Sequence, residues 1–295
     1  MKIINLSILM FAILAWSCQP KKTNESSTIE TPKKVTPTLT KVWESDTTIL
    51  TPESVIFNEA DGILYVSCIA GVPPTAKDGD GYIAKISPEE GSIVELKWVT
   101  GMHAPKGMGI VNGKLYVTDI DEIIEIDIAA GTIANRYAIE GATFLNDIDV
   151  SSSGDVFITD MGTNKIHLLK NGLVSTVLED VNLGGPNGLL HLGDKLMASS
   201  SKAGNFYEIN TMDWTYIVVT DSIFGGDGVE KTGDDFLVSS WNGEIYYVAA
   251  DGSKTKMLDT KGVSNTADIE FVEATSTVYV PTFFGNQVVA YKLTK

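Results

Sequence analysis

Six polar residues recur at the start of short apolar segments, and their side chains are of the kinds that bind cations or transfer protons. They are Glu53, Lys106, Asn146, Asn187, Asp227 and Asp268. From Lys106 onward, successive members are separated by 40, 41, 40 and 41 residues. Regular spacing of this length is typical of equivalent positions in a structural repeat, so we expect these distant side chains to meet around one point.

Four of these side chains could together bind a metal ion. The carboxylates of Glu53 and Asp227 and the amides of Asn146 and Asn187 offer four hard oxygen ligands with a charge of −2. Such a set suits calcium, with magnesium or manganese as alternatives, and it lacks the imidazole and thiolate groups that zinc and copper usually take. We therefore predict one divalent metal site formed by these four residues.

The segments between these residues are strand-like. Six similar apolar runs lie between turn-forming residues: GILYVSCI, GKLYVTDI, GDVFITDM, DKLMASSS, DDFLVSSW and STVYVPTF. Helical periodicity is almost absent from residue 40 onward, which argues against a helical solenoid. A repeat of about 40 residues with four strands is typical of a propeller blade, so the chain is predicted to be an all-β, six-bladed β-propeller with four-stranded antiparallel blades.

The ends of the repeat predict how the ring closes. The last unit has only three candidate strands, and residues 40–50 form a strand-like segment without a unit of its own. We expect this N-terminal segment to supply the outermost strand of the last blade. The first interval, from Glu53 to Lys106, is 53 residues long because of the Pro- and Gly-rich insertion Ala70 to Gly81, which should rim the face that carries the recurring polar residues.

The first 38 residues differ from the rest. Residues 1–17 have the charged start and apolar run of a secretory signal, and Leu14 to Cys18 resembles a bacterial lipobox. We expect Cys18 to be lipidated, residues 18–38 to form a flexible tether, and residues 39–295 to form the propeller. A membrane-anchored lipoprotein of the bacterial envelope follows, on the periplasmic side or at the cell surface. An ordinary signal peptide with a chance cysteine is the alternative.

The net charge limits the classes of possible partner, and the cysteine count excludes a disulfide in the mature chain. The chain has 295 residues, with 22 Lys and Arg against 38 Asp and Glu, for a net charge of −16. This charge argues against nucleic acid as a partner and is compatible with cations. Cys68 is the only cysteine besides Cys18, so the mature chain has no intramolecular disulfide. We expect a monomer that binds a small molecule.

A family resemblance rests on the four metal-ligand candidates in their motifs. Glu53 in PES, Asn146 in LND, Asn187 in GPNG and Asp227 in GGDG resemble the metal-binding series of the regucalcin and gluconolactonase family, to which the paraoxonases are more distantly related. The resemblance spans residues 40–295 and implies a six-bladed propeller that hydrolyses a lactone or ester with a calcium-like ion. Phe144 replaces the arginine of the sugar lactonases, which favours a more apolar substrate.

The resemblance also implies a mechanism. The ion would polarise the substrate carbonyl while a carboxylate takes a proton from the attacking water. Asp227 is the first candidate for this base, with Asp268 and Asp147 as alternatives. Lys106 stands near the position where paraoxonases have a histidine, and it is expected either to balance surplus negative charge or to hold a carboxylate of the substrate.

Other interpretations remain open. Asn187-Gly188 and Asp227-Gly228 could be simple turns, since both dipeptides favour turns. A propeller that binds a metal or ligand without turnover, or an NHL-like interaction propeller without metal, would fit the same repeat. Trp241 and Phe283 are expected either to wall the pocket or to pack between blades. His103 could face a substrate, whereas His167 and His191 suggest surface or packing roles.

Overall fold

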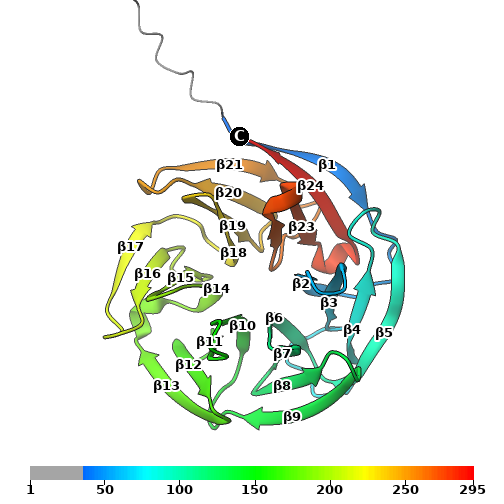
Figure 1. Cartoon of the computed structure of the whole chain (residues 1–295). Helices are drawn as coiled ribbons and strands as arrows, with labels where there is room; N and C mark the ends of the chain where they lie inside the picture. The colour runs from blue at the N-terminus through cyan, green and yellow to red at the C-terminus, as the bar shows by residue number, and fades with distance from the viewer. Residues whose placement is uncertain (1–35) are drawn as a thin grey trace, which may run out of the picture. The chain divides into compact units, whose positions relative to one another are not determined.

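The computed structural model describes residues 36–295, and the predictions for the signal, for Cys18 and for the tether up to residue 35 lie outside this range. The described residues form six four-stranded antiparallel sheets around a common axis (Figure 1). They contain no α-helix, and therefore no helix long and apolar enough to cross a membrane. The predicted all-β, six-bladed propeller is confirmed.

Each blade runs from an innermost strand at the axis to an outermost strand at the rim. Blades 1 and 2 are β2 (Pro52–Asn58), β3 (Ile63–Cys68), β4 (Gly81–Ile86) and β5 (Ile93–Met102), then β6 (Pro105–Val111), β7 (Lys114–Asp119), β8 (Glu122–Asp127) and β9 (Thr132–Ala138). Blades 3 and 4 are β10 (Leu145–Val150), β11 (Val156–Asp160), β12 (Lys165–Lys170) and β13 (Leu173–Glu179), then β14 (Pro186–Leu192), β15 (Lys195–Ser200), β16 (Phe206–Asn210) and β17 (Tyr216–Thr220). Blades 5 and 6 are β18 (Gly226–Thr232), β19 (Asp235–Ser240), β20 (Glu244–Val248) and β21 (Lys254–Asp259), then β22 (Glu270–Val272), β23 (Thr277–Pro281), β24 (Val288–Thr294) and β1 (Thr38–Glu44). Three short 3-10 helices, η1 (Val181–Leu183), η2 (Glu273–Thr275) and η3 (Phe283–Gly285), lie in the connections.

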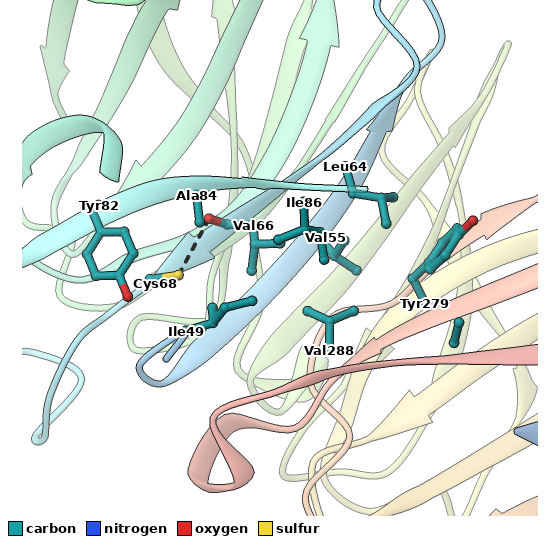
Figure 2. Close-up of a cluster of buried hydrophobic side chains, with 11 residues drawn as sticks. Ile49, Val55, Leu64, Val66, Cys68, Tyr82, Ala84, Ile86, Tyr279 and Val288 are labelled. Carbon is teal, nitrogen blue, oxygen red and sulfur yellow. Dashed lines mark hydrogen bonds between the residues drawn. The ribbon is translucent and has the colours of Figure 1, made fainter. Parts of the chain in front are cut away.

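The core lies between the faces of neighbouring blades. The middle strands are apolar on both faces and are almost fully buried, whereas outermost strands such as β9 alternate between exposed and half-buried residues. Figure 2 shows the cluster between blades 1 and 6, where Val55, Leu64 and Val66 face Tyr279 and Val288. The fold thus buries apolar surface in six similar layers, without any disulfide among the described residues.

The ring is closed by the two ends of the described chain. Strand β1 pairs antiparallel with β24, in a register that sets Thr38 opposite Thr294. The Trp43 ring packs 5.7 Å from the Tyr279 ring, and both side chains donate hydrogen bonds to the backbone carbonyl of Pro88 in blade 1. The predicted closure is confirmed, although the strand ends at Glu44, before the predicted residue 50. The segment after it turns inward and buries Ile49 completely.

Candidate functional site

The innermost strands of the first five blades are irregular where the recurring polar residues stand. Their pairing with the second strands shifts register between Pro52 and Ser54, Pro105 and Met108, Leu145 and Ile148, Pro186 and Leu189, and Gly226 and Val229. Such bulges interrupt a ladder locally and redirect a side chain. Here they bring Glu53, Lys106, Asn146, Asn187 and Asp227 to the wall of one pocket of about 600 Å³. All five side chains are buried.

Asn187-Gly188 and Asp227-Gly228 are not turns. Asn187 and Gly188 lie inside β14, and Asp227 and Gly228 lie inside β18, so the turn interpretation is wrong for both pairs. The glycines are needed because neighbouring inner strands approach each other closely at the axis. A Cβ atom on Gly188 would lie only 1.7 Å from the backbone oxygen of Asp227.

A series of Ser and Thr hydroxyls donates hydrogen bonds to backbone carbonyls near the start of the inner strands. Each hydroxyl comes from the end of a second strand and donates to the backbone carbonyl of a residue in the next blade, 28 residues further on. The pairs are Thr118 to Asn146, Thr159 to Asn187, Ser199 to Asp227, and Ser239 to Ala267. Asn146, Asn187 and Asp227 lie within the bulges, so the first three of these bonds satisfy carbonyls where the ladder is interrupted. Sequence reasoning missed this series, although the recurring Ser or Thr in VTD, ITD, ASS and VSS was a usable signal.

Asp268 does not join the other five residues, and this part of the predicted ring is wrong. The Ser239 bond identifies Ala267 as the equivalent of Asp227, so the interval is 40 residues rather than 41. A shift of one residue along a strand turns a side chain to the opposite face. Asp268 consequently lies beside Ser54, whose hydroxyl donates to its carboxylate at 2.6 Å.

Asp268 and Asp147, the two alternatives for the catalytic base, line a second cavity of about 220 Å³ between the inner strands, together with Asp149, Glu230 and Glu270. Neither of the two alternatives lines the pocket with Asp227. Asp147 accepts hydrogen bonds from the backbone nitrogens of Ile148 and Leu189, so its carboxylate ties β10 to β14. This contact gives Asp147 a structural role.

Burial and mutual charge perturb the ionisable groups of the pocket. Burial, followed by the neighbouring Asp227, raises the pKa of Glu53 well above its usual value. Burial and then Asp268 raise the pKa of Asp227 in the same way. Burial lowers the pKa of Lys106 to about 8, although Glu53 and Asp119 partly oppose this. Carboxyl groups crowded in a dry site favour their protonated forms until a cation neutralises them.

The donor atoms in the pocket fit a hard divalent cation. The side-chain nitrogen of Asn187 donates to the Gly226 carbonyl at 3.2 Å, and that of Asn146 contacts the Met161 sulfur at 3.9 Å. These contacts of the nitrogens set the orientation of both side-chain amides. Oε2 of Glu53 and Oδ1 of Asn187 are buried and accept no hydrogen bond from any group of the described residues. Within residues 36–295, no three His, Cys, Asp and Glu side chains cluster as a metal site, so a site here would depend on the amide oxygens as well as on two carboxylates.

The rest of the pocket wall is mostly apolar and aromatic. Trp241 and Phe283 line the pocket, as one of the two interpretations expected, and their rings meet edge to face at 5.7 Å. Phe224 and Phe284 also line it, and each is 59% exposed. The insertion between β3 and β4 contributes Val72 and Pro74, which confirms that it borders this face. An exposed ion pair of 2.7 Å between Lys77 and Asp121 connects the insertion with blade 2.

The three histidines lie outside the pocket wall. The backbone nitrogen of His103 donates to Asp119, while its Nδ1 atom is buried without a partner. His167 contacts the Thr176 hydroxyl through Nδ1 at 3.1 Å, and the His191 ring stacks on Phe157 at 5.0 Å. His167 and His191 therefore have the packing roles that the sequence suggested.

Comparison with known proteins gives structural neighbours of low sequence identity. No family model and no curated protein matches the sequence. A gluconolactonase from Xanthomonas campestris superposes with a TM-score of 0.64 at 16% identity, covering 84% of this chain and 88% of its own. Virginiamycin B lyase from Staphylococcus aureus, crystallised with quinupristin, gives 0.62 at 15% identity, covering 87% and 99%. These likenesses show that the chain shares the six-bladed propeller fold of gluconolactonase and virginiamycin B lyase.

Proposed function

We propose that the protein is a divalent-metal-dependent hydrolase of a lactone or ester, with calcium as its ion. The observation that carries this proposal is the pair of buried oxygens without partners, Glu53 Oε2 and Asn187 Oδ1, in a pocket that Asp227 and Asn146 also line. A buried polar atom without a partner costs about 1–3 kcal/mol. A cation bound by these oxygens would remove that cost.

Six residues of the pocket wall have definable tasks in this reaction. The ion, when bound by Glu53, Asn146, Asn187 and Asp227, would polarise the substrate carbonyl. Asp227 takes a proton from the attacking water at a carboxylate oxygen and returns it to the leaving alcohol. Phe144 and Trp241 hold the substrate and exclude bulk water from the buried polar groups.

The lining supports an apolar substrate. Phe144 occupies the place at which the sugar lactonases have an arginine, and Met161, Phe224 and Phe284 extend the apolar wall. A neutral sugar lactone would leave most of its hydroxyls facing these side chains without hydrogen-bond partners. A lactone or ester with an apolar body suits the pocket better.

Chelation and one substitution test the proposal together. Purified protein with calcium or manganese is assayed against a panel of lactones and esters, before and after treatment with EDTA. We expect turnover that EDTA abolishes and calcium restores, and a loss of about 100-fold or more in Asp227→Asn. Glu273→Gln, on the exposed helix η2, serves as the matched control. Absence of turnover across the panel would end the catalytic proposal.

A propeller that binds a metal or ligand without turnover is the second candidate. It is supported by the scarcity of proton carriers, because Glu53, Lys106, Lys202 and Asp227 are the only ionisable side chains on the pocket wall in the described part of the chain. Calorimetry would then show tight calcium binding and a raised melting temperature without hydrolysis. A rate that depends on Asp227 would exclude this candidate.

We also propose, from the sequence of residues 1–38, that Cys18 carries a lipid anchor that holds the protein at a bacterial membrane. The predicted monomer likewise remains part of the proposal. An anchored hydrolase would act on small molecules that reach the envelope.

A further inference from the structure

In the described part of the chain, Lys106 carries a buried ammonium group that pairs with no carboxylate. Its side chain is 1% exposed, and no carboxylate oxygen of residues 36–295 forms an ion pair with Nζ within 4.0 Å. Nζ donates one hydrogen bond of 2.8 Å to the Ala104 carbonyl and lies 4.8 Å from the centre of the Phe144 ring. An ammonium has three donors, so most of its hydrogen-bonding capacity is left for a ligand.

The position of this ammonium is fixed by the loop before it. Both carboxylate oxygens of the fully buried Asp119 are engaged, accepting from the backbone nitrogens of His103 at 2.8 Å and Ala104 at 2.7 Å. Asp119 therefore holds the Ala104 carbonyl in place, and that carbonyl holds Nζ. The bulge between Pro105 and Met108 brings Lys106 to the pocket wall. A charge held in this way is prepared for a ligand at little further cost in side-chain entropy.

The charge of the site favours an anion once the metal is bound. The buried side chains Glu53, Asp227 and Lys106 together carry −1 when all are ionised, and a divalent cation changes this to +1. Lys202, an exposed residue of the same pocket wall, adds one more positive charge. A ligand with a single negative charge would then neutralise the buried part of the site. This local balance is opposite to the net charge of −16 of the whole chain.

The surroundings of Lys106 define the rest of the ligand. Phe144 is next to the ammonium, and the rings of Trp241, Phe283 and Phe284 form an edge-to-face group on the same pocket wall, with centroids 4.8–5.9 Å apart. Phe284 is largely exposed, so a ligand that covers it would gain by burial.

We propose that the pocket selects ligands in which a free carboxylate is attached to an apolar, ring-containing body, and that Lys106 binds the carboxylate. The inference rests on the proposed function for the reaction, since it narrows the substrate to lactones or esters that carry such a carboxylate. The binding preference itself does not depend on the proposed reaction and rests on the contacts of Lys106. A lysine that only balanced the charge of Glu53 would give no preference between an anion and its neutral analogue.

A pair of ligands of the same shape tests this without catalysis. Isothermal titration calorimetry compares 3-phenylpropionate with 3-phenylpropionamide, using the full-length protein in mild detergent with calcium at constant ionic strength. We expect the carboxylate to bind about tenfold more tightly than the amide. We expect Lys106→Met to bind both equally, and Lys106→Arg to retain part of the preference. Equal binding of the two ligands by the unaltered protein would overturn the inference, and no variant is needed to see it.

The controls separate this inference from the proposed function. Lys202→Met removes the other pocket lysine and should keep the preference, and a loss of preference there instead of in Lys106→Met would also overturn the assignment. Amide binding and melting temperature report whether Lys106→Met is folded. Hydrolysis of neutral lactones is measured in parallel. If the hydrolase proposal fails, no turnover appears while the preference for the carboxylate persists, whereas failure of this inference removes the preference and leaves turnover unaffected.

Discussion

The hydroxyl of Thr159 donates a hydrogen bond of 2.8 Å to the backbone carbonyl of Asn187, one blade further along the chain. The same oxygen accepts from the backbone nitrogen of Asp147 at 2.9 Å. One side chain thus satisfies two backbone groups that bulges in two different inner strands leave without ladder partners. The position of Asn187 in the pocket therefore depends on a residue of the neighbouring blade.

Replacing this hydroxyl should weaken both the fold and the site. Thr159→Val keeps the shape but leaves the Asn187 carbonyl and the Asp147 nitrogen unpaired, so we expect a loss of about 1–3 kcal/mol in the free energy of unfolding and weaker calcium binding. Urea unfolding and calorimetry measure the two effects. Thr132→Val, on the exposed strand β9, should change stability by less than about 0.5 kcal/mol. Equal effects of the two substitutions would contradict the role given to Thr159.

Gly188 should tolerate no side chain. In Gly188→Ala, the added carbon would meet the backbone oxygen of Asp227, and relief requires two inner strands to move apart. We expect destabilisation of roughly 3 kcal/mol or more, or a protein that does not fold. Gly71→Ala is the matched control, because its Cβ would have no neighbour within 4 Å and its φ angle is not positive. Thermal unfolding of the two variants tests the close approach.

The acidic cavity predicts a loss of stability as pH rises. Burial raises the pKa of Glu270 to about 8 and that of Asp149 to about 6, with Asp268 and other nearby carboxylates adding to the first. The folded state thus binds more protons than the unfolded state between about pH 4 and pH 8, so stability is greatest at the acidic end and falls towards pH 8. Because one pKa unit corresponds to about 1.4 kcal/mol, we expect each group to contribute a few kcal/mol.

Urea midpoints at four values from pH 5 to pH 8, with EDTA present, check this prediction. The double variant Asp149→Asn, Glu270→Gln should reduce the dependence without abolishing it, because burial also raises the pKa of Asp147, Glu230 and Asp268 in the same cavity. A profile that stays flat or rises with pH in the unaltered protein would contradict the raised pKa values of the cavity carboxyl groups.

The lipid anchor can be tested in cells. Bacteria that express the protein are grown with an alkyne analogue of palmitate, and labelling is followed by click chemistry. We expect the label on the unaltered protein and its loss in Cys18→Ser, which should also move from the membrane to the soluble fraction. Cys68→Ser is the control, because the Cys68 thiol is buried in blade 1. Labelling that survives Cys18→Ser would refute the anchor.

The repeat was sufficient to predict the fold, because its period and strand patterns are local properties of the sequence. The same reasoning placed Glu53, Lys106, Asn146, Asn187 and Asp227 in one pocket. It failed at Asp268, where the motif ADI offers a polar residue one position too late. In a strand, such an offset of one residue decides which cavity a side chain faces.

Other features could not be predicted from local patterns in the sequence. The close approach that requires Gly188 exists only after the inner strands have assembled around the axis, so the dipeptide looks like an ordinary turn. Likewise, no carboxylate oxygen of residues 36–295 forms an ion pair with Nζ of Lys106 within 4.0 Å, and this follows from the three-dimensional structure, which spacing along the chain does not encode. The metal, the substrate and the anchor remain predictions.

The closure of the ring by β1 and β24 also constrains the order of folding. Ser45 and Val288, hydrogen-bonded at the end of this pair, are 243 residues apart in the chain. Of the described strands, β1 is synthesised first and its partner β24 last, so during translation blade 6 has an open edge until β24 emerges. Contacts of such long range slow folding and leave an edge open to aggregation. Blades 1 to 5 can each assemble from contiguous sequence, whereas the sixth blade must wait for both ends of the propeller.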